Sequence, residues 1–550
     1  MKKTRLALAL ALLLALPSSV GLAADALPTS DIVTPAGELP IVTEPITLTF
    51  GVATQARVED FDTNLYTLFL EEQTGVDIAF DMLPTKDAVQ KVQLAMMSGG
   101  DMPDAYLQLD RSAANPFSVD NAPKYGREGI IYPLNDMIDE YGYYLNQVFE
   151  EQPELRALIT SADGNIYFFP GYSPSTINKS PTKFWINQGW LDNLGLEVPT
   201  TTEEFYEVLL AFKNDDPNGN GKQDEIPMAG TLFNNGFWNS GYDYLINAFI
   251  YNDPQNTRLY VEDGVVDFAP VKEGWRDAMI YLNRLCAEDL LSPLTFTQDE
   301  EQLKQMCNDT NDILGGYTAL GIQHIANGSS EEVISRYAAI PPLEGPTGLR
   351  VHTMNPTLPY TGGVITTACE DPVAMFRLFD YMMSEEACLR SRYGEKGVDW
   401  DDPAPGDISI FGTEATVKIL SPSMGTTQNA TWINLQPYIS RPKHSNGQGW
   451  NGNPLEGEYI NAQAAMMYQE YAPTEFVSTL IMNEEEVERV SGIRLDIETY
   501  IKENIAQFAT GVKDPNDDAV WDAYVAEYEK LDLPTFLEVA RTVYARMNDN

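Results

Sequence analysis

The chain has 550 residues, and 81 Asp and Glu against 35 Lys and Arg give it a formal net charge of -46 at pH 7. This charge repels phosphate groups, which argues against binding to nucleic acid or to an anionic membrane surface. Hydrophobic residues make up 43% of the chain and aromatic residues 11%, which excludes an acidic disordered chain, and the length predicts two or more lobes.

The first 24 residues predict a cleaved export signal. Three basic residues precede an apolar run, and Gly21–Ala24 supplies the small residues that a signal peptidase needs. A retained anchor is the alternative, but the apolar run is shorter than the ~18 to 20 residues that span a bilayer. Residues 25–44 are rich in Pro, Thr and acidic residues without periodicity, so we expect a flexible tether there.

The next part of the chain alternates short strands with helices. Strands are predicted at 46–52, 76–83 and 104–109, and the helices between them end at Gly75 and at Gly99–Gly100. This alternation is typical of an open α/β sheet with parallel pairing.

A second α/β unit is predicted from residue 169 onward. Thr201 and Glu204 form a capping box at the start of a helix whose apolar residues share one face. A Gly- and Pro-rich connection and a strand between residues 337 and 368 indicate that the chain returns to the first lobe. Helices at 483–509, 516–530 and 533–547 are then expected to close the second lobe. The expected boundaries are 45–168 with 345–420 for lobe 1, and 169–344 with 421–550 for lobe 2.

Four cysteines fall into two local pairs along the chain. An exported protein meets an oxidising environment, and the spacing favours bridges between Cys286 and Cys307 and between Cys369 and Cys388. Buried free thiols remain the open alternative, and no cysteine has metal-ligand spacing.

The most specific motif is DDPNGNGKQDEIP at residues 215–227, which sets oxygen donors at alternate positions of an EF-hand-like loop. Gly221 stands at the sixth position, where a left-handed backbone turns the next carbonyl toward the ion. Pro227 replaces the usual Glu at position 12, so Glu225 must supply the bidentate carboxylate. The predicted ligands of a structural Ca²⁺ in lobe 2 are Asp216, Asn218, Asn220, the Lys222 carbonyl, Asp224 and Glu225. A surface turn with solvated acids is the alternative.

In their order and spacing, several segments resemble the extracellular solute-binding proteins of family 1, in the subgroup similar to LipO-type lipoproteins and alginate-binding periplasmic proteins. The likeness covers most of residues 45–548. It rests on MSGGDMPDAYL, DGNIYFFP, WLDNLGLEVPTTTEEFYEVLLAFK running into the calcium loop, YGEKGVDW, IETYIKENIAQFATG and WDAYVAEYEKLDLPTFLEVARTVYARM.

The resemblance implies a two-lobed, periplasmic-binding-protein-like α/β fold with a ligand cleft between the lobes. It also implies closure around an oligosaccharide, delivery to an ABC permease pair in the membrane, and calcium at the six positions named above. Many relatives carry a lipobox cysteine, whereas Ala23–Asp25 has none. We therefore expect an exported monomer of the periplasm, cell envelope or extracellular space, without a lipid anchor.

Two aromatic, polar segments are the candidate sugar-binding loops, because ring faces cover the C–H side of a sugar while amides and carboxylates bind its hydroxyls. The first, 233–244, supplies Asn234, Asn235, Trp238, Tyr242 and Asp243, and the second, 429–453, supplies Trp432, Arg441 and Trp450. Core packing of Trp238, and a surface loop at 429–453, remain open alternatives. Weaker candidates are Tyr317 and Tyr360, together with Gln108 and Asp110 at the carboxyl end of a strand, where open α/β sheets place ligand contacts.

Sequence signatures of catalysis are missing: the chain has no G-x-S-x-G elbow, no H-E-x-x-H motif and no P-loop. Its histidines, His324, His352 and His444, are far apart in the sequence, which argues against a triad or a zinc site. We expect a binding protein rather than an enzyme. A secreted glycan-active hydrolase and a cell-wall glycan-binding scaffold remain the alternatives.

Overall fold

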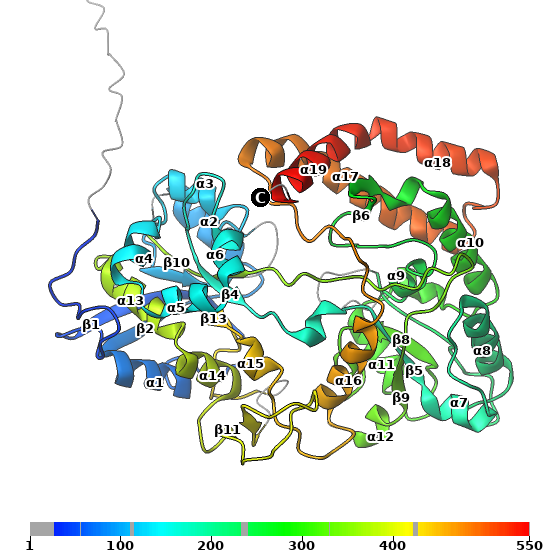
Figure 1. The fold of residues 1–550 in the computed structure, drawn as a ribbon, viewed down its shortest axis with the longest axis horizontal. Helices are drawn as coiled ribbons and strands as arrows, with labels where there is room; N and C mark the ends of the chain where they lie inside the picture. Colours follow the sequence, from blue (N-terminus) through cyan, green and yellow to red (C-terminus); the bar gives the residue numbers. More distant parts are fainter. Residues whose placement is uncertain are drawn as a thin grey trace, which may run out of the picture.

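The computed structural model describes residues 27–55, 57–98, 100–109, 115–232, 240–328, 330–421 and 427–548. Figure 1 shows two groups of elements, each built around its own sheet, with extended segments of chain passing between them. Across these described ranges, no helix combines the length and the apolar character that crossing a membrane requires.

Lobe 1 is built on a six-stranded sheet with the order β13-β4-β10-β3-β1-β2. Its strands are β1 (Ile46–Ala53), β2 (Val76–Leu83), β3 (Ala105–Leu107), β4 (Phe169–Tyr172), β10 (Tyr360–Ile365) and β13 (Tyr438–Ile439). The predicted parallel pairing is confirmed, since β1 pairs in parallel with both β2 and β3. Strand β10 runs antiparallel to β3 and β4, and β13 runs parallel to β4.

Helices surround this sheet in lobe 1 (Figure 1). They are α1 (Leu65–Thr74), α2 (Ala88–Ser98), α3 (Ala122–Arg127), α4 (Asn135–Tyr141), α5 (Tyr144–Glu151), α6 (Pro153–Ile159), α13 (Pro372–Met382) and α14 (Glu385–Tyr393). Helix α1 ends at Gly75 with φ of 75°, as predicted, because only glycine adopts this left-handed conformation at little cost.

Lobe 2 has a smaller, antiparallel sheet with the order β8-β5-β9, and a separate hairpin of β6 and β7. The strands are β5 (Lys183–Asn187), β6 (Leu259–Glu262), β7 (Val265–Phe268), β8 (Gly316–Ala319) and β9 (Tyr337–Ile340). The helices are α7 (Gln188–Leu194), α8 (Thr202–Asn214), α9 (Tyr242–Ile246), α10 (Glu273–Ala287), α11 (Glu300–Cys307), α12 (Glu331–Ile334), α16 (Gly457–Gln469), α17 (Glu484–Ala509), α18 (Asp518–Lys530) and α19 (Leu533–Asn548). The Thr201–Glu204 capping box is confirmed at the start of α8.

Short elements complete the chain. The 3-10 helices are η1 (Thr176–Lys179), η2 (Ala269–Val271), η3 (Pro293–Phe296) and η4 (Ile322–His324), and the remaining pieces are β11 (Trp400–Asp401), β12 (Lys418–Ile419) and α15 (Pro442–Ser445).

The expected flexible tether is not what the structure shows for residues 27–44. Ile41 and Val42 are buried in the core of lobe 1, and Val33 forms a β-bridge with Val42. The buried guanidinium of Arg377 donates hydrogen bonds to the carbonyls of residues 34 and 38. The segment is held because it supplies acceptors to a buried cation and covers apolar surface.

The lobe boundaries also differ from the expected ones. Strand β4 lies in the sheet of lobe 1, so the first crossing follows residue 172 rather than 168. Residues 432–439 return to the core of lobe 1, and β13 adds a strand beside β4. The last part of lobe 2 therefore begins near α16 rather than at residue 421.

All four cysteines are free thiols, so the expected bridges are absent. Cys307, Cys369 and Cys388 are buried, and burial raises the pKa of Cys286 and of Cys307 to about 12. The thiols behave as small apolar side chains of the cores, and their burial suppresses the reactive thiolate.

Candidate functional site

Three described segments pass between the lobes and meet lobe 1 at one edge of its sheet. They are residues 173–182, 341–359 and 440–456, which follow β4, precede β10 and follow β13. The antiparallel register of β10 places its amino end beside the carboxyl ends of β3 and β4. The junction therefore lies at the carboxyl edge of the parallel strands, where open α/β sheets hold ligands.

A group of buried polar side chains lies at this edge: Thr361, Asn434 and Gln436. Gln436 is 0% exposed, and neither atom of its amide has a hydrogen-bond partner among the described residues. The Thr361 hydroxyl and the Asn434 carbonyl oxygen are likewise buried and unpartnered within the described part of the chain. A buried polar group without a partner requires a specific explanation, and at a ligand edge the explanation is a water molecule or a bound ligand.

The backbone brings these side chains together. A methyl group added to Gly362 would lie 2.7 Å from the Pro437 Cα, so β10 and residues 436–437 approach more closely than any other residue type allows. Ile433 and Asn434 both have positive φ, at 56° and 57°. Consecutive left-handed non-glycine residues are strained, and such strain is concentrated at functional sites. The sequence carries no local signal for this arrangement.

Polar side chains of η4 and α16 bond one another in lobe 2, and the charge of Glu458 acts on the end of α14 in lobe 1. The Gln323 amide donates to Glu458 at 3.1 Å, and Asn461 donates to Gln323 at 2.7 Å. The Tyr393 phenol at the end of α14 has its pKa raised by burial and by the charge of Glu458. Lobe 2 therefore contributes a carboxylate and two amides to this region, and lobe 1 contributes a phenol.

Trp432, predicted as a sugar contact, is a core residue instead. Its side chain is 0% exposed and lies among the rings of Phe50, Phe61, Tyr66 and Phe80 in lobe 1. Its indole N–H donates to the Thr67 hydroxyl at 2.9 Å. The prediction fails because a large aromatic ring gains more from complete burial than from a surface position.

Tyr317 is also committed to structural contacts rather than to a ligand, and Arg441 is bonded within lobe 1 through two of its nitrogens, while its Nη1 has no partner among the described residues. Tyr317 is fully buried, packs edge-on against Tyr337, and donates from its hydroxyl to the Ile322 carbonyl. Arg441 donates to Glu151 at 2.7 Å and to the Met383 carbonyl at 3.2 Å, which fixes the start of the third crossing segment.

Tyr242 and Asp243, both in α9, are buried as well. Tyr242 stacks on Phe296 with ring centroids 5.8 Å apart. The Asp243 carboxylate forms an ion pair with Arg258 and also accepts hydrogen bonds from Ser240 and Asn252. This network satisfies a charge inside lobe 2, so the Asp243 side chain is not available to a sugar.

Three of the predicted ligand residues remain near the junction. Trp450 is half-buried and stacks on Tyr459, with 4.4 Å between ring centroids. Tyr360 is half-buried and donates to the Asn434 carbonyl, and the backbone N–H of Gln108 donates to the Leu435 carbonyl. Asn234, Asn235, Trp238 and Asp110 lie outside the described residues.

The predicted calcium loop curls as an EF-hand-like turn. Gly221 has φ of 75°, as its sixth position requires. The Asp216 carboxylate accepts the N–H groups of Asn220 and Gly221, and the Asn220 side-chain oxygen accepts that of Lys222. These side-chain oxygens therefore point into the loop, toward the position that an ion would occupy.

The acidic side chains of the loop differ in their environment. Hydrogen bonding from the Asn220 amide lowers the pKa of Asp224, whereas burial, with the charges of Asp224 and Asp216, raises the pKa of Glu225. The Glu225 Oε1 atom is buried and has no hydrogen-bond partner in the described chain. The described residues include no group of three or more His, Cys, Asp or Glu side chains that could hold a metal ion, so the three carboxylates of the loop do not converge on one point in this structure. An orphaned carboxylate oxygen beside inward-facing oxygens nevertheless fits a hard cation.

A family model for bacterial extracellular solute-binding proteins matches residues 50–387. The chain belongs to this family. It is 27% identical over 494 residues to the fructooligosaccharide ABC transporter substrate-binding protein FusA of Streptococcus pneumoniae. The aligned region covers 88% of this chain and 86% of FusA. It is also 27% identical to lipoprotein LipO of Bacillus subtilis, over 60% of this chain and 63% of LipO. These relatives are not enzymes.

Solved structures agree with this family assignment. This solute-binding protein superimposes on FusA in complex with kestose, and on a FusA EF-hand mutant in complex with fructo-nystose, with TM-scores of 0.75 and 0.74 at 25% identity. Each covers 92% of this chain and all of the FusA chain. The alginate-binding protein AlgQ2 without calcium ion shares the fold, with a TM-score of 0.63 at 22% identity over 92% of this chain and 98% of AlgQ2. The two-lobed α/β fold is therefore confirmed.

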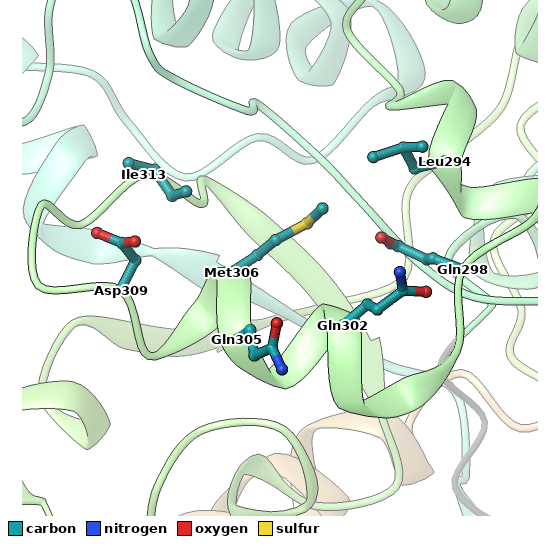
Figure 2. A pocket seen from close by; sticks show the side chains of 7 residues that line it. All are labelled: Leu294, Gln298, Gln302, Gln305, Met306, Asp309 and Ile313. Carbon is teal, nitrogen blue, oxygen red and sulfur yellow. The ribbon is translucent and has the colours of Figure 1, made fainter.

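A pocket of about 260 Å³ lies between η3 and α11 of this solute-binding protein (Figure 2). Figure 2 shows the Gln298 and Gln302 side chains on one side of it and Met306 near its centre. The lining residues are Leu294, Gln298, Gln302, Gln305, Met306, Asp309 and Ile313. All of them belong to lobe 2, so this pocket is separate from the junction between the lobes.

Proposed function

We propose that this protein captures an oligosaccharide at the junction between its lobes and delivers it to an ABC permease pair in the membrane. The observation that carries the proposal is the convergence of three crossing segments on the carboxyl edge of the lobe 1 sheet, where the amide of Gln436 is buried and has no partner among the described residues. The fructooligosaccharide and kestose named for FusA support a sugar as the ligand.

Amide and hydroxyl groups at this edge would bind sugar hydroxyls, and half-buried aromatic rings would cover the C–H faces. Gln436, Asn434 and Thr361 provide the polar groups, and Tyr360 and Trp450 provide the rings. The extracellular nature of the family supports an exported protein.

We further infer that calcium occupies the loop of lobe 2. The ion would be held by Asp216, Asn218, Asn220, the Lys222 carbonyl, Asp224 and Glu225, and it would offset two of the three negative charges of the loop. The loop is tied to its surroundings, since Asn193 of α7 donates to the Pro217 carbonyl and Ile226 N–H donates to the Ile313 carbonyl. Calcium would therefore brace α7, α8 and the residues before β8. The FusA EF-hand mutant supports a loop of this kind in the family.

A pair of conservative variants tests the ligand site. Gln436→Leu replaces a buried, unpartnered amide with an apolar group of similar size, so it should preserve or raise the melting temperature. The same change should weaken binding of kestose, measured by titration calorimetry, by about thirtyfold, because two hydrogen bonds of ~1 kcal/mol each are lost.

The matched control is Tyr66→Phe. It removes a hydroxyl that, like the Gln436 amide, is buried without a partner among the described residues, but that lies in the core of lobe 1. This variant should leave the affinity unchanged. Kestose, longer fructooligosaccharides and galacturonan fragments are compared by thermal shift, with product analysis by chromatography. Equal affinities of Gln436→Leu and wild type would show that Gln436 does not contact the ligand. Release of smaller sugars would show that the protein is a hydrolase rather than a binding protein.

A further inference from the structure

A lysine ammonium is buried where the first crossing segment enters lobe 2. Lys183 begins β5 and is 0% exposed. Its Nζ donates to the carbonyls of Ile177 and Leu320, both at 2.9 Å, and to the carbonyl of Ser180. Two of these carbonyls belong to the crossing segment and the third follows β8 of lobe 2. The three ammonium protons therefore join the crossing segment to the body of lobe 2.

This ammonium has no carboxylate within 4.0 Å in the described part of the structure. The charged and titratable groups that act on it are Glu458 of α16, His324 of η4 and His352 of the second crossing segment. Burial lowers the pKa of each histidine to about 4, so both rings are neutral at pH 7. A buried charge without a counterion is costly, and the three carbonyl bonds are what offset that cost. The ammonium is therefore stable here only while the crossing segment and lobe 2 stay joined.

The segment that Lys183 holds is also tied to the second crossing segment. The backbone N–H of Asn355 donates to the Lys179 carbonyl at 3.0 Å, and η1 packs against α16. The Ser180 and Thr182 hydroxyls are buried and lack partners within the described residues. These two hydroxyls add nothing to the anchoring of the turn, so Lys183 and the Asn355–Lys179 bond are the polar contacts that hold it.

We propose that Lys183 is a positioning residue for lobe movement: its ammonium fixes η1 to lobe 2, so that the lobes reorient about residues 173–175. In this arrangement η1 moves with lobe 2 as one body, and the bend is confined to the short stretch between β4 and η1. A neutral amine has only two N–H donors, so loss of the proton releases one of the three carbonyls. Since burial lowers the pKa of Lys183 to about 7, this release falls within the pH range in which the protein is handled.

The test compares Lys183→Met with Lys179→Met, in the full-length mature protein without ligand. Lys179 lies in the same turn, its side chain is exposed, and only its backbone carbonyl is used, so the control removes an equivalent side chain without touching the anchor. Hydrogen exchange of the amides at 176–182 should be about tenfold faster in Lys183→Met than in wild type. X-ray scattering should show a larger radius of gyration or a broader distribution of lobe orientations. Lys179→Met should match wild type in both measurements.

A second arm uses pH and needs no variant that folds poorly. The wild-type scattering profile should change between pH 6 and pH 9, with a midpoint set by Lys183, and the profile of Lys183→Met should stay constant. If Lys183→Met does not fold, Lys183→Gln, which keeps two N–H donors, takes its place and should show the exchange of the wild type at pH 9. Identical exchange at 176–182 in the lysine variants, or a wild-type profile that is unchanged with pH, overturns the proposal.

Discussion

Trp432 offers the sharpest test of the distinction between a ligand contact and a core residue. Its indole is enclosed by four aromatic rings of lobe 1 and donates a hydrogen bond to Thr67. Trp432→Ala removes this buried ring and leaves a cavity, and such changes cost about 3 to 5 kcal/mol. Trp432→Phe keeps an aromatic ring in the cluster but loses the N–H donor and some volume, and about 1 to 2 kcal/mol is expected.

The assay is guanidinium denaturation of the full chain, followed by tryptophan fluorescence and by far-ultraviolet circular dichroism. Because two lobes can unfold separately, the transitions are fitted independently, and only that of lobe 1 should shift. Trp450→Ala is the control, since Trp450 is half-buried and stacks on a single ring, and its cost should stay near 1 kcal/mol.

The opposite result is easy to recognise. If Trp432→Ala unfolds like wild type while binding of kestose disappears, then Trp432 contacts the sugar and the aromatic cluster is not its main environment. A loss of stability with the affinity of the folded fraction retained supports the core assignment.

Three further perturbations follow from the described contacts. Chelation of calcium should lower the melting temperature of lobe 2, by an amount equivalent to about 2.7 kcal/mol when calcium stands at 100 times its Kd. Asp224→Ala should reproduce this loss, and the neighbouring Asp215→Ala should not. Equal melting temperatures with and without chelator would refute the calcium site. Asp243→Ala leaves Arg258 buried without its carboxylate and should cost about 3 to 5 kcal/mol, against less than 1 kcal/mol for the exposed Asp289→Ala, as denaturant titration measures. Burial raises the pKa of Asp253 to about 6. Protonation is therefore favoured in the folded state, so the contribution of this group to stability is present below the unfolded pKa near 4 and is lost as pH rises through about 6. Wild type should gain roughly 2 to 3 kcal/mol relative to Asp253→Asn as pH falls from 8 to 4.5, and a constant difference would contradict the shift.

The local patterns of the sequence predicted the parallel part of lobe 1 well. Strands β1 and β2 begin where the alternation of residues begins, and α1 ends at Gly75 as expected. The capping box of Thr201 and Glu204 begins α8 at the predicted position. These features are encoded within a few neighbouring residues, so a single sequence suffices to find them.

Pairings between distant residues were not predictable in the same way. Strand β13 has two residues, and its place beside β4 depends on a partner more than 260 positions earlier in the chain. The tether was misassigned for a similar reason, because its apolar residues find their partners in lobe 1 and its carbonyls find Arg377. A segment without periodicity is flexible only if nothing distant binds it.

Aromatic residues were the weakest guide to the ligand site. Trp432, Tyr317 and Tyr242 are all fully buried, as large rings in a chain of this size usually are, and the sequence does not distinguish a ring that packs from a ring that binds sugar. The turn of the loop was predictable, because Gly221 at the sixth position has the positive φ that the motif requires, whereas calcium there stays a prediction.

Buried polar groups give a better indication of where the protein works. A ring gains free energy by entering a core, so its burial is explained by stability alone. The unpartnered amide of Gln436 and the counterion-free ammonium of Lys183 lose free energy on burial, so an account of the folded state by itself leaves both residues unexplained. One lies at the sheet edge beside the crossing segments and the other holds the first of those segments to lobe 2. Both unfavourable burials therefore lie at the junction between the lobes. A bound sugar would offset the cost of burying the Gln436 amide, and the control of lobe orientation would account for the Lys183 ammonium.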